Sequence, residues 1–339
     1  FYDGGAEDES TLRHNRSAFE QHRLAPRVLV DVAQPQTATQ LMGAPVGLPM
    51  AIAPTGALGF GWRDADLHLA RAAAAQGIPF TLSSSGTASI EAVAKASTGR
   101  LWFQAYVLRN QDFFWQMIDR ADRAGFEALV LTVDAPVNGV RDRERRHGLP
   151  QAEGVRPAHW PTPPVPSGEG LCGGVAEAAP TWADVQWLMA QTRLPVLLKG
   201  ITHPLDAREA LAVGAAGLIV SNHGGRVLDT LPATAELLPR VAEAVRAQRQ
   251  DALVLVDGGI RRGTDLFKAL ALGADAALVG RPALYGLAHA GARGAAHVLR
   301  LLRDEFEATL ALTGCASVQH IHPDHLWPLN PTAAPAPLS

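Results

Sequence analysis

The sequence has little cysteine and no long hydrophobic run, and each shortage excludes a class of protein. Cys172 and Cys315 form no CxxC pair and are too few for a disulfide framework or a cysteine-rich metal site. No segment approaches the roughly 18 to 20 apolar residues that span a bilayer, and no signal-peptide pattern opens the chain. We therefore predict a protein of the reducing cytoplasm, with no metal site and no membrane partner.

An excess of charge is also missing. The formal net charge is −3 over 339 residues, which gives no electrostatic reason to expect nucleic acid as a partner. With 47% hydrophobic and 19% charged residues the chain is typical of globular proteins, so a small molecule is the expected ligand. Only Lys95, Lys199 and Lys268 are lysines among 30 basic residues, and this arginine bias favours a bacterial cytoplasm.

Short apolar segments, each followed by a helical pattern, recur along the chain. The strand candidates are residues 49–54, 79–83, 101–106, 128–134, 195–200, 217–222, 252–259 and 276–282. The helix candidates are residues 64–76, 111–124, 182–191, 205–213, 233–246, 264–272 and 291–312. The strands show little polar alternation, which indicates burial on both faces, as in a parallel sheet. Eight β-then-α units predict an α/β fold, the (β/α)8 TIM barrel.

A doubly wound sheet is the alternative fold, but no glycine-rich dinucleotide fingerprint follows the first strand. We expect a single domain over residues 1–339, with the barrel at about 48–315 and a C-terminal tail at about 316–339. Prolines and glycines crowd the segment of about 147–180, after the fourth strand, where the helical pattern fails. This segment is predicted to be a long, mobile lid loop over the barrel.

The active site of such a barrel lies at the C-terminal ends of its strands. All eight predicted strands are followed there by polar residues or glycines. These are Thr55, Gly56, Ser83, Ser84, Ser85, Gln104, Tyr106, Thr132, Asp134, Lys199, Ser221, Asn222, His223, Arg226, Asp257, Gly258, Gly259, Arg261, Gly280 and Arg281. Ordinary turns would rarely place lysine, histidine, aspartate and several arginines at one rim.

The last two strands end in DGGIRRG and VGRP. Glycine-rich turns leave backbone N–H groups free to face an anion, Arg261 and Arg281 add charge, and the following helices add their positive N-terminal ends. These features predict a phosphate site, which is recurrent at this place in the barrel. The alternative is that the glycines only form turns and the arginines lie on the surface.

His223 follows the sixth predicted strand and is a candidate general base. Asp134 ends the fourth strand and could orient the imidazole and stabilise its protonated form. A lone histidine is more often a structural hydrogen-bonding residue, but Arg226 and Asp134 favour the catalytic interpretation. Lys199 closes the fifth strand, and it could form a Schiff base, stand as a cation beside an electron-rich ring, or extend to solvent.

In combination, these motifs resemble the FMN-dependent 2-hydroxy acid oxidases and dehydrogenases, the family of glycolate oxidase, lactate oxidase and mandelate dehydrogenase. The matching motifs occur in order from Phe1 to about Cys315. They are GAEDES, LPMAIAPTG, TLSS, WFQAYV, LTVDAP, LPVLLKG, SNHGGR, LVDGGIRRGTDLFKALALGA, VGRP and RDEFEATLALTGC. The resemblance implies oxidation of an (S)-2-hydroxy acid to a 2-oxo acid, with O2 or another electron acceptor, in a homotetramer.

The resemblance also implies a role for each site residue. His223 would be the base, Asp134 the carboxylate behind it and Tyr106 the hydrogen-bond partner of the substrate oxygen, while Arg226 and Arg141 would bind the substrate carboxylate. The FMN ring and ribityl chain would be held by Pro54, Thr55, Gly56, Ser83, Gln104, Thr132, Lys199 and Ser221. The phosphate end would be held by Asp257, Gly258, Gly259, Arg261, Gly280 and Arg281.

Three positions near the substrate or the flavin depart from glycolate oxidase. Phe1 stands where that enzyme has a tyrosine that helps bind the carboxylate, so a hydrogen bond of about 1 to 1.5 kcal/mol should be missing. Ser85 replaces a tryptophan that narrows the pocket, so substrates larger than glycolate should be accepted. Gly56 replaces alanine beside the flavin, which leaves dehydrogenase or monooxygenase activity open as alternatives to oxidase activity.

Other functions also stay open. The chain could be a type 2 isopentenyl diphosphate isomerase, an FMN-binding paralogue without catalysis, or an aldolase that uses Lys199 as a Schiff base. The intact residues for proton transfer and carboxylate binding argue against the first two, and a yellow purified protein would exclude the third.

Overall fold

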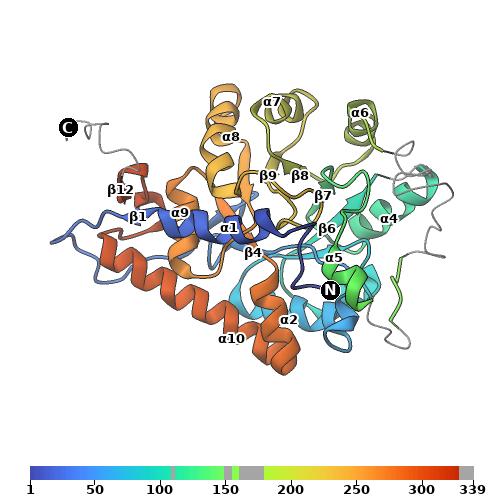
Figure 1. The fold of residues 1–339 in the computed structure, drawn as a ribbon, viewed down its shortest axis with the longest axis horizontal. Helices are drawn as coiled ribbons and strands as arrows, with labels where there is room; N and C mark the ends of the chain where they lie inside the picture. The colour runs from blue at the N-terminus through green and yellow to red at the C-terminus, as the bar shows by residue number, and fades with distance from the viewer. Residues whose placement is uncertain (108–110, 149–154, 160–178, 328–339) are drawn as a thin grey trace.

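The computed structural model describes residues 1–107, 111–148, 155–159 and 179–327, and its centre is a closed barrel of eight parallel strands (Figure 1). In order around the barrel these are β4 (Met50–Ile52), β5 (Phe80–Ser83), β6 (Leu101–Tyr106), β7 (Ala128–Thr132), β8 (Val196–Ile201), β9 (Gly217–Val220), β10 (Leu253–Val256) and β11 (Ala276–Val279). Pairing of β11 with β4 closes the ring. The predicted TIM barrel is confirmed, and each strand overlaps its predicted segment.

Helices surround the barrel. They are α2 (Ala65–Gln76), α3 (Ile90–Ala96), α4 (Gln111–Arg123), α6 (Trp182–Gln191), α7 (Pro204–Ala212), α8 (Thr234–Gln248), α9 (Gly263–Ala271) and α10 (Arg281–Thr313). The short α3 was not predicted, because seven residues carry too little periodicity. Helix α10 was predicted to begin at 291 but begins at Arg281, where Pro282 suits the first turn of a helix. The backbone is non-helical at Ala290 and Gly291, so a kink separates its two parts.

The interior of the barrel is filled by apolar side chains. Trp102, Val130, Leu197, Ile219 and Leu255 belong to one fully buried cluster. A larger cluster joins the outer faces of the strands to the helices. Because both faces of every strand are buried, the strands read as continuous apolar segments in the sequence.

Several smaller elements lie outside the barrel. They are α1 (Ser10–Gln21), β1 (Arg23–Leu24), β2 (Thr39–Leu41), β3 (Ala44–Val46), η1 (Leu58–Phe60), α5 (Asp142–His147), η3 (Val318–His320), η4 (Pro323–His325) and β12 (Leu326–Trp327). The strands β1 and β12 pair with each other, as do β2 and β3. Most of the predicted lid, 147–180, lies outside the described residues. No helix in the described part of the chain is long and apolar enough to cross a membrane.

Helix α1 is held at both ends by side chains of the barrel, and Figure 1 shows it crossing the barrel beside α9. The carboxylate of Asp229 accepts hydrogen bonds from the N–H groups of Ser10 and Thr11, at 3.0 and 2.7 Å. At the other end, Lys268 Nζ donates to the carbonyl of Phe19 at 2.9 Å. Each charge complements the helix dipole at its end, so α1 is fixed between the loop that follows β9 and helix α9.

We predict that Asp229→Asn lowers the free energy of unfolding by about 1 to 2 kcal/mol at neutral pH, since two N–H groups at the start of α1 lose a charged acceptor. Burial raises the pKa of Asp229, but hydrogen bonds from Thr11 and Ser10 outweigh it and hold the pKa below its usual range. This stabilisation is therefore complete above the unfolded pKa of about 3.9 and is lost as pH falls through the folded pKa.

Urea unfolding at neutral pH and in acid will measure the free energy of unfolding of the Asp229→Asn variant and of the unsubstituted protein. The difference between these two free energies should shrink in acid. Asp251→Asn is the control, because the Asp251 side chain is 90% exposed. Equal stability of Asp229→Asn and the unsubstituted protein at neutral pH would contradict the proposed helix cap.

Candidate active site

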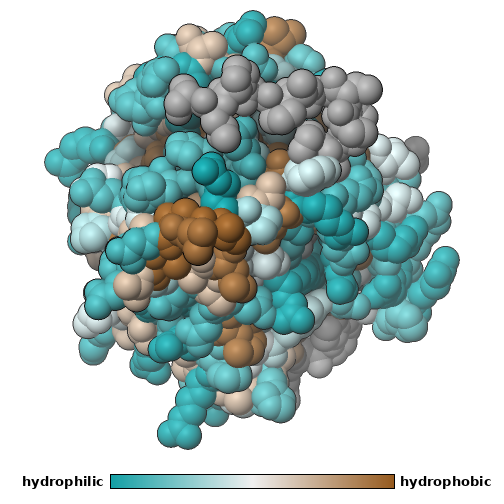
Figure 2. All heavy atoms as spheres, turned by 90° about the vertical axis from the view of Figure 1, so that its left-hand side faces the viewer, coloured by the Kyte–Doolittle hydropathy of each residue, from teal (hydrophilic) through white to brown (hydrophobic). Residues whose placement is uncertain are grey.

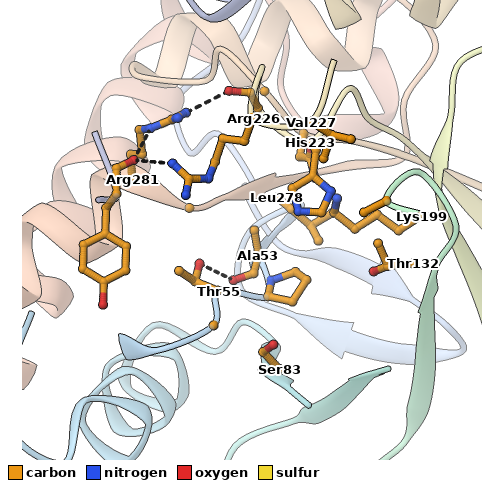
Figure 3. A pocket seen from close by; sticks show the side chains of 18 of the residues that line it. Ala53, Thr55, Ser83, Thr132, Lys199, His223, Arg226, Val227, Leu278 and Arg281 are labelled. Carbon is orange, nitrogen blue, oxygen red and sulfur yellow. Dashed lines mark hydrogen bonds and ion pairs between the residues drawn. The ribbon is translucent and has the colours of Figure 1, made fainter. Parts of the chain in front are cut away.

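A cavity of about 320 Å³ opens at the C-terminal ends of the strands, and Figure 3 shows Arg226, His223 and Lys199 around it, with Thr55 and Ser83 nearby. All the site residues predicted from the sequence line this cavity except Ser84, Asp134, Ser221 and Asn222. Lining residues that the sequence did not single out are Tyr2, Ala53, Ala57, Ala135, Val137, Asn138, Gly139, Gly224, Val227, Ile260, Leu278, Val279 and Leu284. Most of these are immediate neighbours of predicted residues, and this was the only signal that could have found them.

His223 and Asp134 form a pair across two strand ends. His223 follows β9 and Asp134 follows β7, and His223 Nδ1 lies 2.8 Å from Asp134 Oδ1. Burial raises the pKa of Asp134, but the charge of Lys199 and the hydrogen bond from His223 outweigh it and hold the pKa below its usual range. Asp134 is therefore an anion that accepts the Nδ1–H, which leaves Nε2 of the imidazole as the free base.

Lys199 is buried, with a relative exposure of 3%, behind this pair. Its Nζ donates to Ser221 Oγ at 3.0 Å and lies 3.8 Å from Asp134 Oδ2 and 3.6 Å from Asp257 Oδ2. Burial lowers the pKa of Lys199, but the charges of Asp134 and Asp257 outweigh it and raise the pKa above its ordinary value. A lysine that stays protonated cannot act as the amine nucleophile of a Schiff-base aldolase, so the geometry favours a fixed cation.

Two guanidinium groups and one phenol stand near this base. Burial, together with the charges of Arg141 and Arg281, lowers the pKa of Arg226 to about 10. Arg141 Nε donates to Glu144 at 2.6 Å. Burial keeps the pKa of Tyr106 above its usual range, so its hydroxyl is a neutral hydrogen-bond donor. Together these residues can bind a carboxylate and a neighbouring oxygen.

Arg261 and Arg281 lie at the other end of the cavity, beside the glycine-rich turns. Burial lowers the pKa of both side chains, and the charge of Arg261 lowers that of Arg281 further. Among the described residues neither arginine forms an ion pair, and Arg281 donates only to the carbonyls of Tyr2, Gly4 and Gly224. Two partly buried guanidiniums that form no ion pair with a carboxylate in the described part of the chain favour an anion, which fits a phosphate group.

A chain of polar side chains forms one wall of the cavity. Ser83 Oγ donates to Gln104 Oε1 at 2.9 Å, and Gln104 Nε2 donates to Thr132 Oγ1 at 3.0 Å. These bonds fix the orientation of the Gln104 amide, whose remaining donor and acceptor sites can serve a ligand. A fixed cation, a polar wall and a phosphate site in one cavity fit the ring, ribityl chain and phosphate of FMN.

The three positions that depart from glycolate oxidase, Phe1, Gly56 and Ser85, all line this cavity. The Phe1 ring lies 5.2 Å from the guanidinium carbon of Arg226 and packs edge-on against Tyr2 and Phe60. The Tyr2 hydroxyl donates to Ala57 O at 2.5 Å, so it does not replace the hydroxyl that Phe1 lacks. A Cβ on Gly56 would lie 3.0 Å from the Cβ of Ser85, so the two residues pack closely and residue 56 has little room for a side chain.

Comparisons with known proteins agree with this site. Glycolate oxidase 1 of Zea mays is 44% identical over 334 residues, covering 96% of this chain and 90% of that protein. The L-lactate oxidase of Nostoc sp. is 42% identical over 334 residues, covering 95% of this chain and 91% of that protein.

Among solved structures, mandelate oxidase with (S)-2-phenylpropionate is 39% identical with a TM-score of 0.87, covering 96% of this chain and 91% of that chain. The monotopic membrane protein (S)-mandelate dehydrogenase is 36% identical with a TM-score of 0.86, covering 96% of this chain and 93% of that chain. A family described as FMN-dependent dehydrogenase matches residues 1–328. The resemblance inferred from the sequence motifs is thereby confirmed, and the chain belongs to the FMN-dependent dehydrogenase family.

Proposed function

We propose that the protein oxidises an (S)-2-hydroxy acid to the 2-oxo acid, with FMN as cofactor and O2 as electron acceptor. One observation carries this proposal: the His223–Asp134 pair faces the same cavity as Arg226, Arg141 and Tyr106. A base beside guanidiniums suits a substrate with a carboxylate and a hydroxyl on adjacent carbons. The oxidases of Zea mays and Nostoc sp. support O2 as the acceptor.

In this mechanism Arg226 and Arg141 bind the substrate carboxylate, and the Tyr106 hydroxyl donates a hydrogen bond to the substrate oxygen. His223 removes a proton at Nε2. Asp134 keeps the imidazole in the required tautomer and stabilises it once it is protonated. The cavity thus fixes the substrate at one end and the proton acceptor beside the carbon that is oxidised.

The chemistry that bound FMN supplies is acceptance of the two electrons that leave the substrate, and their transfer to O2 to give H2O2. Arg261, Arg281 and the backbone N–H groups of the turn at 257–259 would hold its phosphate. Ser83, Gln104 and Thr132 would contact its polar groups, and the Lys199 ammonium would stabilise negative charge.

We predict that (S)-lactate, (S)-mandelate or a longer 2-hydroxy acid, added without oxygen, bleaches the flavin absorbance near about 450 nm. His223→Gln should slow this step by about 100- to 10,000-fold, because the general base is lost. The control is His297→Gln, which changes an exposed histidine of α10 and should leave the rate unaltered.

Admission of air then distinguishes O2 from another electron acceptor. Rapid return of the flavin colour supports an oxidase, and slow return supports a dehydrogenase. A yellow protein that no hydroxy acid bleaches would favour an FMN-binding paralogue without catalysis. A protein that cannot take up FMN would refute the cofactor assignment.

We also propose that the substrate is larger than glycolate, because Ser85, which lines the cavity, stands where glycolate oxidase has a tryptophan. We predict that Ser85→Trp lowers kcat/KM for mandelate about tenfold or more relative to glycolate, since the indole fills the space that a phenyl group needs. Steady-state kinetics with both substrates on one preparation gives this ratio directly. An equal loss of kcat/KM with both substrates would show that the substitution damages the active site in general and does not narrow the substrate pocket.

We propose that the predicted homotetramer forms through a hydrophobic patch. The patch consists of Val28, Leu29, Val30 and Leu312. These side chains are 79%, 102%, 43% and 75% exposed, and the segment packs on the end of α10 through the bond from Arg27 N to Thr313 O. Figure 2 shows a hydrophobic patch on the corresponding face. A patch of this kind on a water-soluble surface commonly marks an interface with another chain.

We predict that Leu29→Asp shifts the protein to a smaller assembly, because a charge would be buried without a partner. Light scattering coupled to size-exclusion chromatography will measure the mass, with Leu205→Asp as the control at a separate exposed leucine on α7. An unchanged mass for Leu29→Asp would exclude this patch from the interface. The cytoplasmic location stays a prediction, which cell fractionation would test.

A further inference from the structure

The turn that carries His223 has an uncommon backbone. His223 and Gly224 have φ of 56° and 62°, and Gly225 N donates to Asn222 O at 3.0 Å, closing the turn. Positive φ at both central positions is the signature of a type I′ turn, which glycine and asparagine tolerate better than histidine. His223 thus needs surrounding contacts to hold it in this conformation.

Asn222 supplies several of these contacts, and it makes two of them with the N-terminal helix. Asn222 Nδ2 donates to Asn15 Oδ1, and Asn15 Nδ2 donates to Asn222 Oδ1, both at 2.8 Å. Each residue is only 2% exposed. This reciprocal amide pair joins α1 directly to the first residue of the turn, 207 positions away in the sequence.

The remaining polar atoms of the pair are also satisfied. Asn222 Nδ2 donates to the carbonyl of Pro232 at 3.0 Å, and Thr234 N donates to Asn15 Oδ1 at 3.2 Å. Replacing either amide would therefore leave buried partners without a hydrogen bond. Neither side chain lines the cavity, so neither can touch the substrate.

We propose that Asn15 and Asn222 are positioning residues that hold His223 in its left-handed conformation and so direct its imidazole toward the substrate. The proposal rests on the proposed function, since it takes His223 as the base. The imidazole is held at Nδ1 by Asp134, while its backbone is held through Ser221 Oγ, which accepts from His223 N at 3.0 Å, and through the amide pair. Loss of the pair frees the turn but leaves Asp134 in place.

Arg226 is anchored independently of this pair. Its guanidinium donates to the carbonyls of Phe1 and Gly4, at 2.9 and 2.6 Å. Carboxylate binding should therefore survive loss of the amide pair better than proton transfer does. A positioning role predicts a fall in the rate of the chemical step with little change in the substrate concentration that half-saturates it.

The test compares FMN-loaded Asn15→Ala and Asn15→Asp with Lys268→Met, which also loosens α1. Lys268 holds the carbonyl of Phe19, one helical turn beyond Asn15, and does not contact the amide pair. Asn15→Asp keeps acceptors for Thr234 N and Asn222 Nδ2, but it replaces the donation to Asn222 Oδ1 by a contact between two oxygens and adds a negative charge. It keeps the volume of the side chain, so it remains informative where Asn15→Ala fails to fold.

The first measurement is the anaerobic rate of flavin bleaching by rapid mixing, with the hydroxy acid that reduces the unsubstituted protein fastest. Both Asn15 variants should be slowed at least tenfold, with the half-saturating concentration changed less than threefold. Lys268→Met should lose thermal stability and keep its rate within twofold. Asn15 variants that react at the unsubstituted rate, or Lys268→Met slowed as much as they are, would overturn the proposal.

The second measurement is amide hydrogen exchange of the segment 221–231, followed by mass spectrometry without substrate. Faster exchange in the Asn15 variants and not in Lys268→Met is expected, and unchanged exchange would refute the restraint on the turn. This measurement does not depend on the reaction. If no hydroxy acid bleaches even the unsubstituted protein, the proposed function fails while the restraint is still tested.

Discussion

The buried ammonium of Lys199 is the group on which the candidate site depends. A cation inside a barrel is costly unless carboxylates and hydrogen bonds compensate it. Asp134 and Asp257 supply the charge and Ser221 the hydrogen bond, so three neighbouring strand ends are committed to one lysine. The same lysine helps to keep Asp134 ionised, and an ionised Asp134 is what orients the imidazole of His223.

The register of the barrel brings the polar side chains of neighbouring strand ends together. Ser83 pairs with Gln104 across β5 and β6, and Thr132 pairs with Lys199 across β7 and β8. Because parallel strands end at the same level, residues far apart in sequence become neighbours on one rim. Hydrogen bonds between side chains then follow along that rim, as between Gln104 and Thr132.

The barrel and most of the rim could be predicted from the sequence because both depend on local patterns. Eight buried apolar strands followed by glycine, serine or charged residues can be recognised without knowledge of contacts. Helix α1 could not be predicted in this way, because the side chains that cap it, Asp229 and Lys268, lie more than 200 residues away in the sequence. The ion pair between Arg141 and Glu144 was also missed, since a spacing of three residues does not reveal that the short helix α5 forms.

The N-terminal segment explains how a cavity with several cations can remain ready for anions. The guanidiniums of Arg226 and Arg281 are oriented by backbone carbonyls, including that of Gly4, which both contact. A carboxylate in the same place would cancel their charge, whereas a carbonyl dipole fixes the geometry and leaves the net charge available. Burial then strengthens the attraction for an incoming anion, since less water competes for the guanidinium. The first residues of the chain thus contribute to anion binding through their backbone, which explains how Phe1 can lack a hydroxyl while Arg226 stays in position.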